Sequence, residues 1–109
     1  MAITYKVLGQ LLPASTTHGS LYTVPISRQA VTSTLCVCNQ GAASTAFRIA
    51  IRPSGASLDP KHYIAYDSIL DANDTVFMTI GATLSSADIV DVYSHNGLVS
   101  FTLFGSESL

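Results

Sequence analysis

The sequence contains little charge. Charged residues make up 11% of its 109 residues, and the formal net charge at pH 7 is −2, whereas about 25% of the residues in an average soluble domain are charged. Apolar residues reach 48%. A folded chain of this composition has a weakly charged surface, which is typical of surfaces buried against other protein. We therefore expect a permanent assembly with other copies of itself, for example a trimer; the alternative is a small, weakly charged monomer.

Clustered basic residues and long apolar runs are also missing. Binding of a nucleic-acid backbone needs a cluster of positive charge, so we expect no nucleic-acid partner. No run approaches the roughly 18 apolar residues of a transmembrane helix. Gly9 and Gln10 interrupt the one N-terminal stretch that resembles a signal peptide. We therefore expect no membrane partner. The absence of a basic cluster is seen in the five basic residues, which are scattered along the chain: Lys6, Arg28, Arg48, Arg52 and Lys61.

Catalytic and metal-binding motifs are absent as well. The sequence has no Gly-x-Ser-x-Gly, P-loop or His-Glu-x-x-His motif. His18, His62 and His95 share no ligand-type spacing, and the only glutamate, Glu107, lies close to the C-terminus. A general acid and base could still come from distant aspartates, but no local pattern favours such a pair. We expect no enzymatic activity, no cofactor and no bound metal.

Cysteine is scarce, and its two residues stand two positions apart at Cys36 and Cys38. On one face of a strand their Cα atoms would lie about 6.6 Å apart, with parallel Cβ vectors that do not suit a disulfide. The sequence offers no further pair of ligands at a spacing that would support a metal. We expect buried free thiols that act as small apolar side chains.

What the sequence does contain is strand-like alternation, with turn residues at intervals of about ten and no helical period. Eight short strands in about 100 residues leave no room for βαβ crossovers, so a parallel sheet is excluded. We predict one all-β domain over residues 1–109, an antiparallel β-sandwich that is jelly-roll-like. The expected strands are Ile3–Leu8, Leu21–Pro25, Ala30–Cys38, Thr45–Arg52, His62–Asp67, Thr75–Ile80, Asp88–Ser94 and Leu98–Phe104.

The segment Val90–Phe104 carries the strongest local signal. At its centre, Asn96-Gly97 favours a two-residue type I′ turn, because both positions tolerate a positive φ. This turn predicts a hairpin in which Val92 opposes Phe101. The alternation then predicts a core made of Val31, Leu35, Val37, Phe47, Ile49, Ile51, Val76, Met78, Val90, Val92, Val99, Phe101 and Leu103.

Four residues in the middle of the chain are candidates for an interface. Arg48 and Arg52 lie on one strand face, where each suits bidentate pairing across an interface; two solvated arginines on a sheet exterior are the alternative. Tyr63 and Tyr66 point to opposite faces if their strand is regular, so at least one of them is exposed. Exposed tyrosines are enriched where protein meets protein or sugar.

Asp91, Tyr93 and His95 stand at every second position of the last predicted hairpin. Metal ligands must converge on one ion, which parallel side chains on a pleated strand do poorly. No sequence partner orients His95 as a base. We interpret this row as an outward polar face that offers hydrogen bonds to a neighbouring subunit.

The strand and turn sequences also resemble those of a known group. They are similar to small virion structural proteins of tailed bacteriophages, cyanophages among them, over nearly the whole chain. These segments are not catalytic signatures, so the resemblance transfers no active residues. The segments are LYTVP (21–25), TLCVCNQG (34–41), FRIAIRPSGA (47–56), HYIAYD (62–67), ANDT (72–75), TLSSADIVDVYS (83–94) and VSFTLFGSE (99–107).

This resemblance implies a structural role in the virion, with a major capsid or tail protein as partner. A capsid decoration (cement) subunit would stabilise the shell through protein–protein contacts. The alternative is a tail, baseplate or fibre-tip module that binds a host-surface glycan or another tail protein. Capsid decoration proteins, tail or baseplate components and fibre heads are all built from β-sandwiches of this kind.

Overall fold

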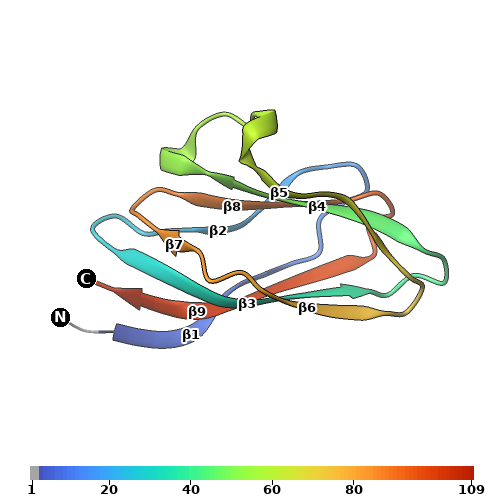
Figure 1. Cartoon of the computed structure of the whole chain (residues 1–109), viewed down its shortest axis with the longest axis horizontal. Helices are drawn as coiled ribbons and strands as arrows, with labels where there is room; N and C mark the ends of the chain where they lie inside the picture. The colour runs from blue at the N-terminus through green and yellow to red at the C-terminus, as the bar shows by residue number, and fades with distance from the viewer. Residues whose placement is uncertain (1–2) are drawn as a thin grey trace.

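Nine strands form two antiparallel sheets that pack face to face in the computed structural model, which describes residues 3–109 (Figure 1). Sheet I has the order β1 (Ile3–Leu11), β9 (Val99–Ser108), β3 (Gln29–Asn39) and β6 (Thr75–Thr79), and the short β7 (Thr83–Leu84) also pairs with β3. Sheet II has the order β2 (Gly19–Thr23), β8 (Ile89–Ser94), β4 (Thr45–Arg52) and β5 (Tyr63–Leu70).

The chain crosses from one sheet to the other at almost every connection. Among the strands longer than two residues, only β4 and β5 are consecutive in the described chain and also paired. The orders β1-β9-β3-β6 and β2-β8-β4-β5 are those of a jelly roll once the two-residue β7 is set aside. The predicted antiparallel, jelly-roll-like sandwich is therefore confirmed. Within residues 3–109, no helix is long and apolar enough to span a membrane.

The core lies between the two sheets and follows the alternation of the strands. The rings of Phe47 in sheet II and Phe101 in sheet I meet edge to face, with centroids 6.2 Å apart. Burying a side chain of this size contributes about 1.5–3 kcal/mol. Of the predicted core residues, nine are buried: Leu35, Val37, Phe47, Ile49, Val90, Val92, Val99, Phe101 and Leu103. Ile51, Val76 and Met78 are partly buried against this cluster.

One core prediction is wrong, because Val31 is 49% exposed. A regular strand would place Val31 on the same face as Leu35. The pairing of β3 with β9 instead shifts between Thr32 and Thr34, so a β-bulge inserts one extra residue there. The bulge reverses the alternation, which turns Val31 outward and Thr32 inward.

The predicted hairpin is also wrong, because β8 lies in sheet II and β9 in sheet I. Gly97 has φ +70°, whereas Asn96 does not adopt the positive φ that a type I′ turn requires. The Asn96 side chain instead accepts a hydrogen bond of 2.9 Å from the Leu98 N–H, and the Gly97 N–H donates to Ser94 Oγ at 3.1 Å. Residues 95–98 thus form a connection between the sheets, closed by side chains.

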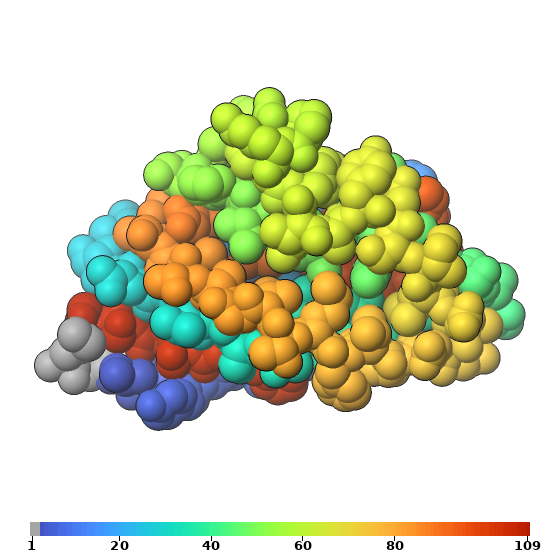
Figure 2. Space-filling view, in the orientation of Figure 1, coloured from blue at the N-terminus to red at the C-terminus, as the bar shows by residue number. Residues whose placement is uncertain are grey.

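The connection between β4 and β5 stands out from sheet II (Figure 1). It contains two single-turn 3₁₀ helices, η1 (Pro53–Gly55) and η2 (Pro60–His62). Asp59 caps η2, since its Oδ1 accepts a hydrogen bond of 3.2 Å from the Lys61 N–H. The same segment forms a projecting lobe in the space-filling view (Figure 2).

Candidate functional site

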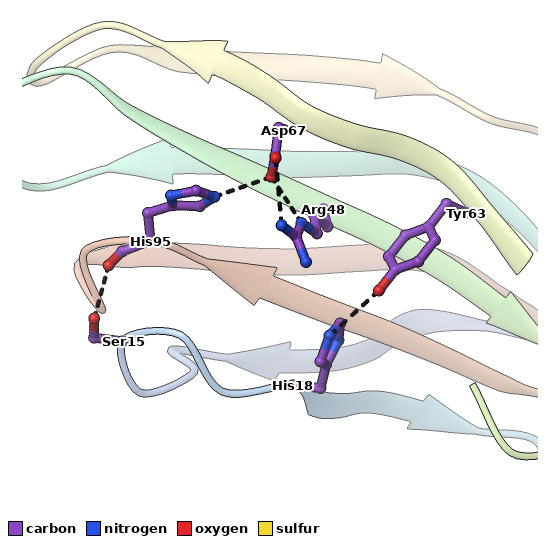
Figure 3. A network of polar contacts seen from close by, with 6 residues as sticks. All are labelled: Ser15, His18, Arg48, Tyr63, Asp67 and His95. Carbon is purple, nitrogen blue, oxygen red and sulfur yellow. Dashed lines mark hydrogen bonds and ion pairs between the residues drawn. The ribbon is translucent and has the colours of Figure 1, made fainter. Parts of the chain in front are cut away.

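Arg48, on β4, is the centre of a polar cluster on the outer face of sheet II (Figure 3). Its Nε donates a hydrogen bond of 2.7 Å to Asp67 Oδ1, and its Nη2 donates one of 3.3 Å to Oδ2. His95 Nε2 lies 2.9 Å from the same Asp67 Oδ1. Asp67 therefore links β4 and β5 to the connection that follows β8, through a bidentate, charge-assisted pair.

The hydrogen bonds from Arg48 and then His95 lower the pKa of Asp67 from 3.8 to about 2. In return, the hydrogen bond to Asp67 raises the pKa of the Arg48 guanidinium above its ordinary value. Both groups are therefore charged at neutral pH. A carboxylate with so low a pKa is a weak base, so the cluster suits structural or binding contacts better than proton transfer.

Aromatic rings surround the Arg48 guanidinium. Its Cζ lies 4.2 Å from the ring centroid of Tyr66 and 4.4 Å from that of Tyr93, in cation–π geometry. Tyr63 meets Tyr66 edge to face with centroids 4.9 Å apart, and its hydroxyl lies 3.3 Å from His18 Nε2. The cluster thus brings together four of the predicted interface residues, with His95 as the fifth.

The two remaining candidates form a separate pair. Arg52 Nη1 lies 3.3 Å from Asp91 Oδ2, while Arg52 Nε donates a hydrogen bond of 2.7 Å to the Ala56 carbonyl. Asp91 is only 3% exposed. This ion pair therefore fixes the β4–β5 connection to β8.

Two orientation predictions are wrong. Tyr63 and Tyr66 lie on the same face of β5, because β5 carries an extra residue opposite β4 in two places and Asp67 has φ +51°. Asp91 and Tyr93 do lie on the outer face of sheet II, but both are buried, beneath Arg52 and Arg48 respectively. Only His95 of that row is exposed and open to a partner.

The sequence analysis missed Asp67 and His18. Asp67 ends the segment HYIAYD, and aspartate is one of the residue types that tolerate a positive φ. An aspartate at this place is therefore a signal that the regular strand breaks there. His18 offers no local signal. Its ring lies 4.8 Å from that of Tyr93 only because β2 pairs with β8 across a long stretch of sequence.

The outer face of sheet I has a different chemistry and is here named the neutral face. The strand pairing places Tyr5 beside Ser106 and Val31, Val7 beside Phe104, and Cys36 between Phe77 and Thr102. Since paired residues share a face, these eight uncharged side chains form one surface across four strands. Tyr5 is 81% exposed and Phe77 is 68% exposed.

A shallow groove of about 610 Å³ runs over one half of the neutral face. Tyr5, Val7, Val31 and Phe104 line it, and so does Lys6. The Lys6 Nζ lies 3.1 Å from the Glu107 carboxylate, so its charge is compensated. The free thiols of Cys36 and Cys38 are half-buried. The cysteines are therefore unbridged, as predicted, but less buried than expected.

No family model, curated protein or solved structure matches this chain.

Function is therefore inferred from the two outer faces. The outer face of sheet II concentrates Arg48, Arg52, Asp67 and Asp91 in internal ion pairs, whereas the neutral face exposes aromatic and β-branched side chains without charge. Among residues 3–109, no three His, Cys, Asp or Glu side chains gather as a metal site. Contiguous exposed apolar side chains mark sites of protein–protein interaction.

Proposed function

We propose that this chain is a non-enzymatic structural subunit of a tailed-phage virion, and specifically a capsid decoration (cement) protein. The resemblance of the strand and turn sequences supports the virion as its place, and the neutral face supports its role as a subunit of an assembly. An antiparallel sheet that faces water normally alternates apolar residues inside with polar residues outside. Sheet I instead exposes Tyr5, Val7, Val31, Phe77 and Phe104.

Burial of the neutral face supplies the favourable free energy of the proposed assembly. Removing apolar surface from water contributes about 25 cal/mol per Å², and a stable contact buries at least about 1,000 Å² in total. Tyr5 and Phe77 are large and largely exposed, so each adds substantially to that area. Aromatic side chains of this kind dominate the energetics of protein interfaces.

Other copies of this chain are the first partner. Two copies can bring this face together without like-charge repulsion, because it carries no charge. The edge strands of sheet I support the same partner. In the described structure β1 pairs only with β9 and β6 only with β3, so each leaves one edge free. Lys6 is the only charged residue of the two strands, and soluble monomers usually protect such edges with charge. Whether the copies form a trimer stays a prediction.

A capsid or tail protein is the second proposed partner. Arg48 and Arg52 already pair with Asp67 and Asp91 within the chain. They are therefore less available for bidentate pairing with a neighbour than the sequence analysis expected. Contacts with the shell are better supplied by an edge of sheet I that the contacts between copies leave free.

Imaging of purified virions, labelled with gold-tagged antibody against this chain, tests the proposal. Label over the whole shell in many copies supports a decoration protein. Label confined to the tail supports the alternative of a tail, baseplate or fibre-tip module. Virions that contain the chain in neither place contradict a virion role altogether.

A further inference from the structure

The projecting lobe and β5 enclose an open cleft on the side of sheet II. The cleft has a volume of about 580 Å³ and is lined by Leu58, Asp59, Pro60, Tyr63 and Tyr66. Small-molecule sites have volumes of about 300–1,000 Å³ and combine apolar walls with a few fixed polar groups. The lobe that supplies three of the five lining residues stands out at the top of Figure 2.

One of the lining residues, Asp59, is held in place by local hydrogen bonds. Asp59 Oδ1 accepts a hydrogen bond from the Lys61 N–H, and the Asp59 N–H donates one of 3.0 Å to His62 Nδ1. This capping box fixes the lobe at the start of η2. Within residues 3–109, Asp59 Oδ2 has no hydrogen-bond partner, so it remains free to accept one from a ligand.

The aromatic wall of the cleft is also fixed in advance. Arg48 covers one face of the Tyr66 ring, with its Cζ 4.2 Å from the centroid, and Tyr63 packs edge to face against the same ring. Tyr66 nevertheless remains 59% exposed. A rigid, exposed ring beside a fixed carboxylate loses little conformational entropy when it binds.

The charges around the cleft select the class of ligand. The Asp59 carboxylate disfavours an anion, while the Arg48 guanidinium, whose Cζ lies 4.2 Å from the Tyr66 ring centroid, disfavours a cation at that ring. A purely apolar ligand would remove water from Asp59 Oδ2 without offering a donor in return. A neutral pyranose has an apolar C–H face that can stack on Tyr66 and hydroxyl groups that can donate to Asp59.

We propose that the cleft formed by Asp59, Tyr63 and Tyr66 binds a neutral pyranose sugar, either free or as a unit of a glycan. The site is independent of the neutral face, which lies on the opposite side of the sandwich. A subunit that buries sheet I in an assembly would still present this cleft. The tyrosines that the sequence analysis offered for glycan contact thus lie side by side in one cleft.

Nuclear magnetic resonance titration of the isotope-labelled chain tests the proposal. The probes are the methyl glycosides of glucose, galactose, mannose and N-acetylglucosamine, each added to about 10 mM, well above the millimolar dissociation constants of weak sites. We expect saturable shifts for at least one probe, centred on the amides of Asp59, Tyr63 and Tyr66. Free sugars and surface glycans are then separated by repeating the titration with oligosaccharides of the sugar that binds.

Variants locate the contact. Tyr66→Ala should weaken the affinity at least about fivefold, the lower end of what loss of an aromatic stacking partner produces. Tyr66→Phe keeps the ring and should bind like the parent. Tyr5→Ala removes an exposed aromatic from the neutral face and should also bind like the parent.

Three outcomes overturn the proposal. One is the absence of saturable shifts with all four glycosides. The second is shifts that centre on residues outside the cleft or survive in Tyr66→Ala. The third is stronger binding of N-acetylneuraminic acid or choline, which would assign the cleft to a charged ligand. None of these outcomes bears on the neutral face, so the proposed assembly role is tested separately.

Discussion

Tyr22 on β2 donates a hydrogen bond of 2.5 Å to Glu107 Oε2 on β9, and this contact joins the two sheets near the chain termini. Glu107 is only 4% exposed, and Lys6 and Arg28 place positive charge 3.1 and 3.9 Å from its other oxygen. The hydrogen bond from Tyr22 lowers the pKa of Glu107, with Lys6 and Arg28 adding to the effect against the opposing influence of burial. The C-terminal strand is thus anchored through a residue that the sequence analysis left without a role.

Removal of the Tyr22 hydroxyl should destabilise the fold. Tyr22→Phe leaves a buried Glu107 oxygen without its donor, which costs about 1–3 kcal/mol in the free energy of unfolding. Urea denaturation measures the change. Tyr5→Phe is the matched control, because Tyr5 is 81% exposed and its hydroxyl should contribute almost nothing. Equal stabilities of the two variants would contradict the role assigned to this hydrogen bond.

The same pair should make stability depend on pH at both extremes. Glu107 has a lower pKa folded than unfolded, so its contribution is present above about pH 4.3, the unfolded value, and is lost as the pH falls through the folded value. Burial, followed by the hydrogen bond to Glu107, raises the pKa of Tyr22. Its contribution is present below about pH 10, the unfolded value, and is lost as the pH rises above it.

Urea midpoints measured from acid to alkaline pH check this expectation. The parent should be most stable between the two limits. Glu107→Gln should flatten much of the acid limb, and Tyr22→Phe should flatten much of the alkaline one. An unchanged pH profile in both variants would contradict the proposed linkage.

Phe101 should be among the most sensitive core positions. It is fully buried and packs against Phe47 across the sandwich, so Phe101→Ala should cost about 3–5 kcal/mol. Ile26→Ala is the control, because Ile26 is 85% exposed in a connection. The difference in urea midpoint between these variants measures the core contribution, and a Phe101→Ala variant that melts like the parent would refute the described packing.

The connection between β8 and β9 should reject a side chain at Gly97. A Cβ there would lie 2.8 Å from the Ser15 backbone nitrogen, in a residue that already has φ +70°. Gly81 has φ +51°, but a Cβ there would meet nothing within 4 Å. Gly81→Ala should therefore cost about 1–2 kcal/mol from backbone strain alone, and Gly97→Ala should cost clearly more. Equal losses of stability in the two variants would contradict this prediction, because they would show that Ser15 moves away from the new Cβ at no cost.

The alternation of apolar residues predicted nine of the buried core residues, but it missed others such as Leu21, Val24 and Leu84, and it did not predict the pairing of the strands. Val92 and Phe101 are both fully buried, as predicted. They would share a face in a hairpin, and they also face each other when their strands lie in opposite sheets. Alternation alone cannot separate these cases. The distinction depends on tertiary contacts of the 95–98 connection, such as the hydrogen bond from Asn96 Nδ2 to Asn39 Oδ1.

The candidate site was predictable only where its strands are regular. Arg48 and Arg52 do share an outer face, because β4 alternates without interruption against β8. Tyr63 and Tyr66 share a face because of bulges in β5, and Val31 turns outward because of a bulge in β3. A bulge shifts the alternation by one residue, and its position depends on the partner strand, which local sequence does not specify.

Sedimentation velocity tests the central claim, burial of the neutral face between copies of this chain, most directly. We expect the parent to sediment as a multimer, and Val31→Lys and Phe77→Lys to sediment as folded monomers, because each places a charge in the proposed contact. Ile69→Lys should remain a multimer, because Ile69 is at least as exposed as Val31 and Phe77, at 74%, but lies on β5 of sheet II. A parent that is monomeric at every concentration, with stability unaffected by dilution, would contradict the claim, as would a multimer that only Ile69→Lys dissociates.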